Sequence, residues 1–338
     1  MAISPSSAMI QSRKKWKNMG RISQLNLLKT IFPPFTNRNV KLLVDKANQH
    51  IAAHLRQSKF YMIGARAQAS FVNPRVDKEQ ALIYVDVEVG NEVVDAGVIH
   101  VGKCEGISRY PEIQITPEAI LLGGTKKGTH AKIWLTPDSV YWHVARGCDY
   151  LGGFSKHDVV CLYDLLYIGI AKEQDSFQRL IKNAHHGRLK VLSEERARKP
   201  GAHPSDEIIL FLFDLEPLSV QQFAAEDDDF DIFCGADQKK VVADAEKAFV
   251  KLLDPAYNVI KFQNYPKGDD GLYGEGLANY AYSLNENMRF MTANSMFKGA
   301  YSEAGLDNRQ DFIMIEGDEV ELHVGDELAP SLFSPVHP

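Results

Sequence analysis

The chain offers little that points to disulfide, zinc or membrane chemistry. Its 4 cysteines lie far apart and no two of them form a Cys-x-x-Cys pair. We therefore expect neither a disulfide framework nor a structural zinc cage. No apolar run approaches the ~18 residues that a membrane-spanning helix needs, and the N-terminal segment lacks the apolar core of a signal peptide. These absences predict a cytoplasmic protein that does not enter a membrane.

Acidic residues are missing from residues 1–41, although they outnumber basic residues in the whole chain. The net charge of −6 argues against a protein that coats nucleic acid without specificity. The basic N-terminal segment could contact phosphates, but a solvated arm is the simpler interpretation.

With 338 residues, the chain is too long for one small domain. The pattern of apolar residues and turns predicts an α+β protein with a small mixed-sheet α/β domain in the middle. Five units are expected: a basic arm, an α+β module, the central domain, a β-rich C-terminal region and a tail. Their expected bounds are 1–37, 38–138, 139–262, 263–326 and 327–338.

Several elements outside the central helices can be predicted from periodicity and turn residues. Residues 37–56 have the spacing of an amphipathic helix, and residues 81–89 and 93–101 form a hairpin around Gly90. Residues 207–213 are a nearly continuous apolar run that begins with Glu207, which is typical of a central strand. Further strands are expected over 139–143, 281–284, 288–292, 312–316 and 319–324.

A strand followed by a helix carries the first group of candidate functional residues. Tyr167 and Gly169 close a buried strand, and residues 175–192 are predicted to be helical with Asp175 as N-cap. The buried stripe of this helix is Phe177, Leu180, Ile181 and Ala184. Arg179, Lys182 and His186 emerge together on another face and are candidate phosphate contacts, with His185 nearer the apolar edge.

A second predicted helix, over residues 239–253, carries the carboxylate of Glu246 near its apolar stripe. Glu246 falls at the margin of that stripe, about 80° from its centre. A half-desolvated carboxylate there either binds a cation or has a hydrogen-bonded partner in the protein. Pro255 ends the helix near Asp254, and Asn258 follows on the exit turn.

Together, these residues resemble the GIY-YIG nuclease family over roughly residues 140–262. The resemblance rests on Tyr167, Ile168 and Gly169, on Arg179 with the two histidines, on Glu246, Pro255 and Asn258, and on the order strand, helix, strand, helix. It implies a small α/β domain that cleaves nucleic acid with a divalent metal ion. By the same resemblance, Glu246 would hold Mg²⁺ or Mn²⁺ and Arg179 would stabilise the pentacovalent phosphorus. Tyr167 would position the water and Asn258 would support the site.

The first tripeptide of the family, Gly-Ile-Tyr about ten residues before Tyr-Ile-Gly, does not occur here. The family usually assigns the general base to the tyrosine of that tripeptide. Tyr141 is one candidate, on a strand-like segment that would require a long insertion. Tyr163 is closer, in a segment that reads equally well as a helix.

The expected function is therefore a metal-dependent endonuclease, with DNA favoured over RNA as substrate. Restriction, phage defence, mobile elements and repair all fit this layout. A local basic strip is the expected phosphate-contacting surface: Arg188, Lys190, Arg196, Arg198 and Lys199. The alternatives are a catalytically degenerate nucleic-acid-binding protein and an interaction protein with no nucleic-acid role.

Overall fold

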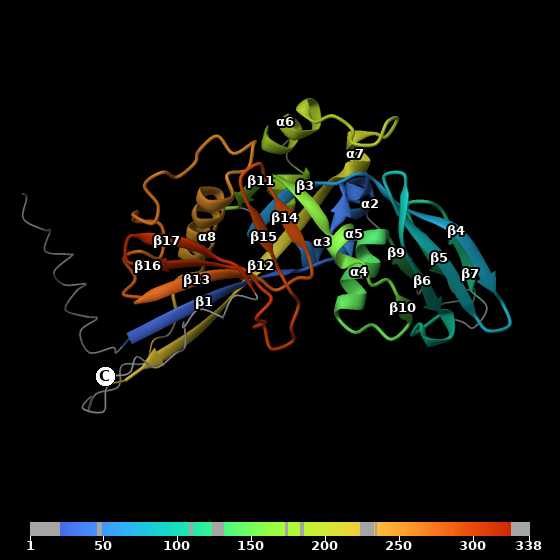
Figure 1. The fold of residues 1–338 in the computed structure, drawn as a ribbon, viewed down its shortest axis with the longest axis horizontal. Coiled ribbons are helices and arrows are strands. Elements are labelled where there is room, and N and C mark those ends of the chain that lie inside the picture. The colour runs from blue at the N-terminus through green and yellow to red at the C-terminus, as the bar shows by residue number, and fades with distance from the viewer. Residues whose placement is uncertain are drawn as a thin grey trace, which may run out of the picture.

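A computed structural model shows a mixed α+β protein with one large, curled mixed sheet, two small sheets and surrounding helices (Figure 1). The structure describes residues 21–45, 49–107, 111–123, 132–172, 175–182, 186–223, 233 and 235–325. The α+β class expected from the sequence is confirmed. Among the helices of these ranges, none has the length and hydrophobicity needed to span a bilayer.

The large sheet has the strand order β15-β14-β11-β3-β12-β1-β13-β16-β17, and β2 also pairs with β12. Its central strands are β11 Leu162–Ile170, β3 Phe60–Ala65, β12 Ile208–Gln222, β1 Arg21–Thr30 and β13 Asn279–Leu284. Strands β11, β3, β12 and β1 are antiparallel to their neighbours in this series, whereas β1 pairs with β13 and β11 with β14 in parallel. The outer strands are β2 Phe35–Thr36, β14 Arg289–Met291, β15 Met296–Lys298, β16 Phe312–Glu316 and β17 Glu319–His323.

Strand β1 corrects the prediction of a solvated arm over residues 1–37. It is buried along nearly its whole length and lies between β12 and β13. Ile22, Leu25, Leu27 and Leu28 make it suitable for a position covered on both faces. Such an arm can therefore extend no further than residue 20. Residues 1–20 and the expected tail from residue 327 lie outside the described ranges.

Residues 66–161 lie between two strands that are neighbours in the large sheet, β3 and β11. This insertion holds a four-stranded sheet, β4 Ala69–Asp77, β5 Leu82–Val89, β6 Glu92–His100 and β10 Leu151–Gly153, and a three-stranded sheet, β7 Glu112–Ile115, β8 Ile120–Gly123 and β9 Lys132–Leu135. The predicted hairpin is confirmed, with Gly90 at a φ of 67° in its turn. In Figure 1 the insertion extends to one side of the large sheet.

Two predictions about the N-terminal half are wrong. The single helix expected over residues 37–56 is instead a set of short pieces, η1 Asn37–Asn39, α2 Val40–Leu43 and α3 Gln49–Leu55. The strand expected over residues 139–143 is the helix α4 Pro137–Ala145, followed by α5 His157–Val160. A capping box between Thr136 and Ser139, with Pro137 in the first turn, starts α4 and overrides the strand-like composition.

The helices that carry candidate site residues lie where the sequence predicts them. The first begins after Asp175, whose Oδ1 accepts a hydrogen bond from the Gln178 backbone N–H at 2.7 Å. The described parts of it are the π-helical turn η4 Gln178–Lys182 and α6 His186–Glu194. Residues 183–185, with the predicted stripe residue Ala184, lie outside the described ranges. The second is α8 Gln238–Leu253, and α7 Pro204–Glu207 precedes β12.

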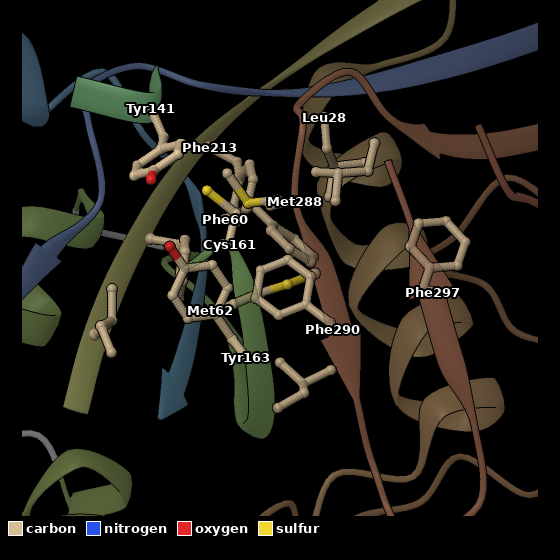
Figure 2. Close-up of a cluster of buried hydrophobic side chains, with 14 of the residues drawn as sticks. Leu28, Phe60, Met62, Tyr141, Cys161, Tyr163, Phe213, Met288, Phe290 and Phe297 are labelled. Carbon is tan, nitrogen blue, oxygen red and sulfur yellow. The ribbon is translucent and has the colours of Figure 1, made fainter. Parts of the chain in front are cut away.

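The side chains of β3 alternate between two hydrophobic clusters on opposite faces of the sheet. Phe60 and Met62 belong to the larger cluster, which α8 and the insertion cover. Figure 2 shows this cluster, with Tyr141 and Tyr163 in it. Tyr61 and Ile63 belong to the second cluster, which contains Phe177 and Leu180 from the segment after β11. The alternation therefore directs Tyr61 towards the segment that carries Arg179.

The remaining strands agree with the sequence prediction. Residues 208–213 of β12 are buried at every position, as expected of a central strand. In the C-terminal region, β13, β14, β16 and β17 lie within one or two residues of the predicted strands, and β15 was not predicted. The turns over residues 285–288 and 317–318 are short, so local residue patterns are sufficient to locate the strands on either side of them.

Candidate active site

Two tyrosines from neighbouring antiparallel strands lie at the centre of the candidate site. In the register of β3 and β11, Tyr61 lies opposite Gly169 and Ile63 lies opposite Tyr167. The two phenol rings are stacked, with centroids 6.2 Å apart and planes inclined by 24°. Tyr61 is 0% exposed, and Tyr167 is half-buried. Sheet pairing thus places two hydroxyl-bearing rings side by side although they are distant in the sequence.

Gly169 makes the close approach of these rings possible. A Cβ atom at this position would lie 2.5 Å from Tyr61 Oη and 2.8 Å from Tyr167 Cε1. Both distances are below the closest carbon contacts found in proteins, so a side chain would displace the phenols. The glycine of the Tyr-Ile-Gly sequence therefore has a packing reason in this fold.

Arg179 and Glu246 act electrostatically on both phenols. Burial raises the pKa of Tyr61 far above its usual value, Tyr167 and Glu246 raise it further, and Arg179 opposes the shift. Burial also raises the pKa of Tyr167; Glu246 adds to this effect and Arg179 counteracts it. A hydrogen bond between the two phenol side chains raises the pKa of Tyr61 and lowers that of Tyr167. The four side chains, Tyr61, Tyr167, Arg179 and Glu246, are called the catalytic cluster below, after the role that is proposed for them in the next subsection.

The environment of Glu246 explains why its proton is held unusually tightly. The residue lies at the edge of the buried face of α8 and is half-buried, as its spacing predicts. Burial raises its pKa to about 7, against the opposing influence of Lys172, Arg179 and Lys247. Asp270, which forms ion pairs with both lysines, acts in the same direction as burial. Glu246 is therefore a desolvated carboxylate surrounded by cations.

The segment after α8 fastens the helix to β11. Asp254 caps the helix in a left-handed conformation with φ 51°, and Pro255 follows, as predicted. The Asn258 side chain accepts a hydrogen bond from the Ile168 N–H at 2.9 Å and donates one to the Ile168 carbonyl at 2.8 Å. Asn258 thus holds the backbone between Tyr167 and Gly169 and does not itself need to touch a substrate.

The catalytic cluster draws on two strands, a π-helical turn and α8. No protein-family model, curated protein or solved structure matches this chain. Any activity must therefore be argued from the chemistry of the cluster: two phenols, a guanidinium that stays charged, and a carboxylate in a desolvated position.

Glu246 fits a divalent metal ion that takes one ligand from the protein. Within the described part of the chain, no group of three or more His, Cys, Asp or Glu residues could enclose a metal ion. Mg²⁺ commonly binds through one or two carboxylates and keeps several waters, so a single half-buried glutamate is compatible with it. A nearby cation would also favour the ionised form of a carboxylate whose pKa burial has raised.

Tyr141 does not reach the catalytic cluster. It lies on α4 within the larger core cluster, and its hydroxyl donates a hydrogen bond to Asp95 Oδ2 at 2.7 Å. Tyr163, the other candidate for the missing tyrosine, donates to Asp138 Oδ1 at 2.8 Å. Both hydroxyls are used inside the protein, in contacts that tie α4 to its surroundings.

Several of the expected phosphate contacts bind other groups of the protein. Arg188 is part-buried, with its guanidinium bound to Asn37 Oδ1 and to the Leu180 carbonyl, each at 2.8 Å. Lys190 lies over the ring of Tyr257 at 5.8 Å. Arg198 pairs with Asp164 and Glu195, and Lys199 pairs with Glu88.

The other expected phosphate contacts are exposed or undescribed. His186 is exposed at the start of α6, and Arg196 is exposed. The Lys182 side chain and His185 lie outside the described part.

Tyr61 is the site residue that the sequence did not reveal. Its strand contains only apolar and small neighbours, and one tyrosine in such a strand is usually a packing residue. The only local signal is its alternation with Phe60 and Met62, which shows that it faces away from the main core. Its partner strand could not be identified because residues 66–161 intervene.

Proposed function

We propose that this protein is a metal-dependent endonuclease that hydrolyses phosphodiester bonds in nucleic acid, with DNA favoured as substrate. We further propose a GIY-YIG-like site in which Tyr61 takes the place of the first tyrosine of the family. The observation that carries this proposal is the pairing of Tyr61 with Gly169 across β3 and β11. It supplies the second phenol that the resemblance requires.

The insertion accounts for the long stretch of sequence between the two strands that carry the tyrosines. In the resemblance, the two tyrosine-bearing strands follow each other after about ten residues. Here β3 and β11 are neighbouring antiparallel strands separated in the chain by residues 66–161. An insertion between two paired strands leaves their register intact if its ends lie close together, because the entropy of loop closure grows slowly with loop length.

The chemistry proposed for each side chain follows from its position. Arg179 would bind the equatorial phosphate oxygens, because a guanidinium stays charged and can bind two oxygens at once. Tyr167 would orient the attacking water, whose proton would pass to bulk solvent. Tyr61, which is buried and protonated, would hold Tyr167 in position through the hydrogen bond between the two phenols. A divalent ion held by Glu246 would stabilise the leaving oxygen. Asn258 would keep the strand between the phenols in place through its two bonds to Ile168.

Nicking of a supercoiled plasmid in Mg²⁺ or Mn²⁺ tests this function. The Glu246→Gln and Arg179→Ala variants should lose nicking, because each removes one charge from the cluster. Glu319→Gln, in the hairpin of β16 and β17, serves as a matched control and should nick at the wild-type rate. Circular dichroism would show that each variant is folded.

Undiminished cleavage by Glu246→Gln would overturn the proposed mechanism. Salt-dependent binding of DNA by the wild-type protein, with no turnover in either metal, would instead support the catalytically degenerate alternative.

A further inference from the structure

Two large aliphatic side chains are exposed on the turn that follows α8. Val259 is 85% exposed and Ile260 is 66% exposed. Among the exposed large hydrophobic residues of the described ranges, these two have the highest exposed fractions. They are also consecutive, whereas single exposed aliphatic residues are ordinary on protein surfaces.

The turn that carries them is fixed to the protein on both sides. Before it, the Tyr257 N–H donates to the Leu166 carbonyl at 3.0 Å, and Asn258 makes its two bonds to Ile168. After it, Lys261 Nζ binds the Pro255 carbonyl and Asp254 Oδ1, each at 2.6 Å. The two aliphatic side chains are therefore held in solvent by a turn whose backbone is anchored at several points.

The position of this turn relates it to the proposed cleavage site. Asn258 binds the backbone of Ile168, the residue between Tyr167 and Gly169. Val259 is the next residue after Asn258, so the exposed pair follows directly on the contact with β11. The neighbouring cations are Lys261, which follows Ile260, and Lys190, which lies over the ring of Tyr257. On such a surface the two aliphatic side chains would contact stacked bases, and the lysines around them would contact phosphates.

We infer that Val259 and Ile260 form a wedge that enters a base step of duplex nucleic acid next to the phosphodiester bond held by the catalytic cluster. This inference rests on the proposed function. Aliphatic side chains that are inserted between bases unstack them and bend the duplex, and a rigid backbone is needed to transmit that force. The preferred substrate would accordingly be a duplex that unstacks easily at the cleaved step.

The double variant Val259→Ser/Ile260→Ser tests the wedge, with the single variant Ile260→Ser as a milder change. Cleavage rates are measured on a duplex and on the same duplex carrying an unpaired bulge at the cleaved step. The ratio of duplex to bulge cleavage should fall about tenfold or more in the double variant, because the bulge is already unstacked. Val93→Ser, at a 55% exposed valine in β6 of the insertion, is the matched control and should keep the wild-type ratio.

A second measurement does not depend on cleavage. Binding of the Glu246→Gln protein should raise the fluorescence of 2-aminopurine placed at the cleaved step, and the same protein with both serine substitutions should not raise it.

The outcomes separate the wedge from the proposed function. An unchanged cleavage ratio and an unchanged fluorescence rise in the serine variants would overturn the wedge and leave the nuclease intact. Absence of metal-dependent cleavage of both substrates by the wild-type protein would overturn the proposed function and the wedge with it. If the serine substitutions abolish concentration-dependent self-association and leave the ratio unchanged, the surface binds a second copy of the chain, which also overturns the wedge.

Discussion

Tyr61→Phe removes one hydroxyl from the catalytic cluster and leaves the packing of the ring unchanged. The ring is fully buried and stacks on Tyr167, so the change should create no cavity. The lost interaction is the hydrogen bond between the two phenol side chains, which should reduce the free energy of unfolding by about 1 kcal/mol. If Tyr61 holds Tyr167 in position for the attacking water, the cleavage rate should fall by about 10²-fold.

Tyr141→Phe is the matched control, because it removes the hydroxyl of the other tyrosine that the sequence suggested. Its bond to the Asp95 carboxylate has a charged acceptor, so the loss of stability should be larger, about 1.5–3 kcal/mol. Its cleavage rate should stay near that of the wild type, since Tyr141 lies in the core and away from the cluster. Urea denaturation gives the stabilities, and single-turnover nicking in Mg²⁺ gives the rates.

The result that would refute the reasoning is simple. A Tyr61→Phe protein that nicks at the wild-type rate, or a Tyr141→Phe protein that is folded but inactive, would show that the phenol on β3 is not the first tyrosine of the site. The two substitutions thus test the strand pairing and the chemistry together.

Three further predictions concern other parts of the site. Gly169→Ala should lower the free energy of unfolding by about 1–3 kcal/mol and abolish nicking, because the new methyl group would collide with both phenols; a denaturation midpoint equal to that of the wild type would contradict this. Burial raises the pKa of Glu246 to about 7, so the folded protein binds a proton there more tightly than the unfolded chain and loses stability as the pH rises from about 4.5 to 7. In EDTA, Glu246→Gln should therefore be more stable than the wild type at pH 8, by up to about 3 kcal/mol, and nearly equal at pH 5; equal melting temperatures at pH 8 would show that the carboxylate is not desolvated. Asn258→Ala should cost about 2–3 kcal/mol in chemical denaturation because it removes both bonds to Ile168. Asn258→Asp keeps the acceptor but places a second carboxylate oxygen against the Ile168 carbonyl, so it should cost at least as much at pH 7; an Asp variant as stable as the wild type would exclude the donated bond.

The elements of the site that the sequence predicted are those defined by local patterns. The second helix was predicted over residues 239–253 and is α8 Gln238–Leu253, because apolar residues at helical spacing and Pro255 mark its length. The same spacing placed Glu246 at the edge of the buried face. The N-cap role of Asp175 and the end of β11 at Gly169 and Ile170 are likewise local properties.

The predictions that failed have a local cause in one case and contacts between distant segments in the other. The strand-like composition of residues 139–143 was overridden by the capping box of α4 and by packing of Tyr141 into the core. The solvated arm was wrong from Arg21 onward because β12 and β13 provide partners on both sides of β1. Neither partner is near β1 in the sequence.

The amino-acid sequence by itself determined where the helices of the site begin and end and which faces of them are buried, because helix spacing, caps and proline act over a few residues. Only the tertiary structure decided which strand lies beside β11. The pairing of Tyr61 with Gly169 joins segments separated by residues 66–161, and such a contact depends on how the whole sheet assembles and leaves no periodic trace in either segment.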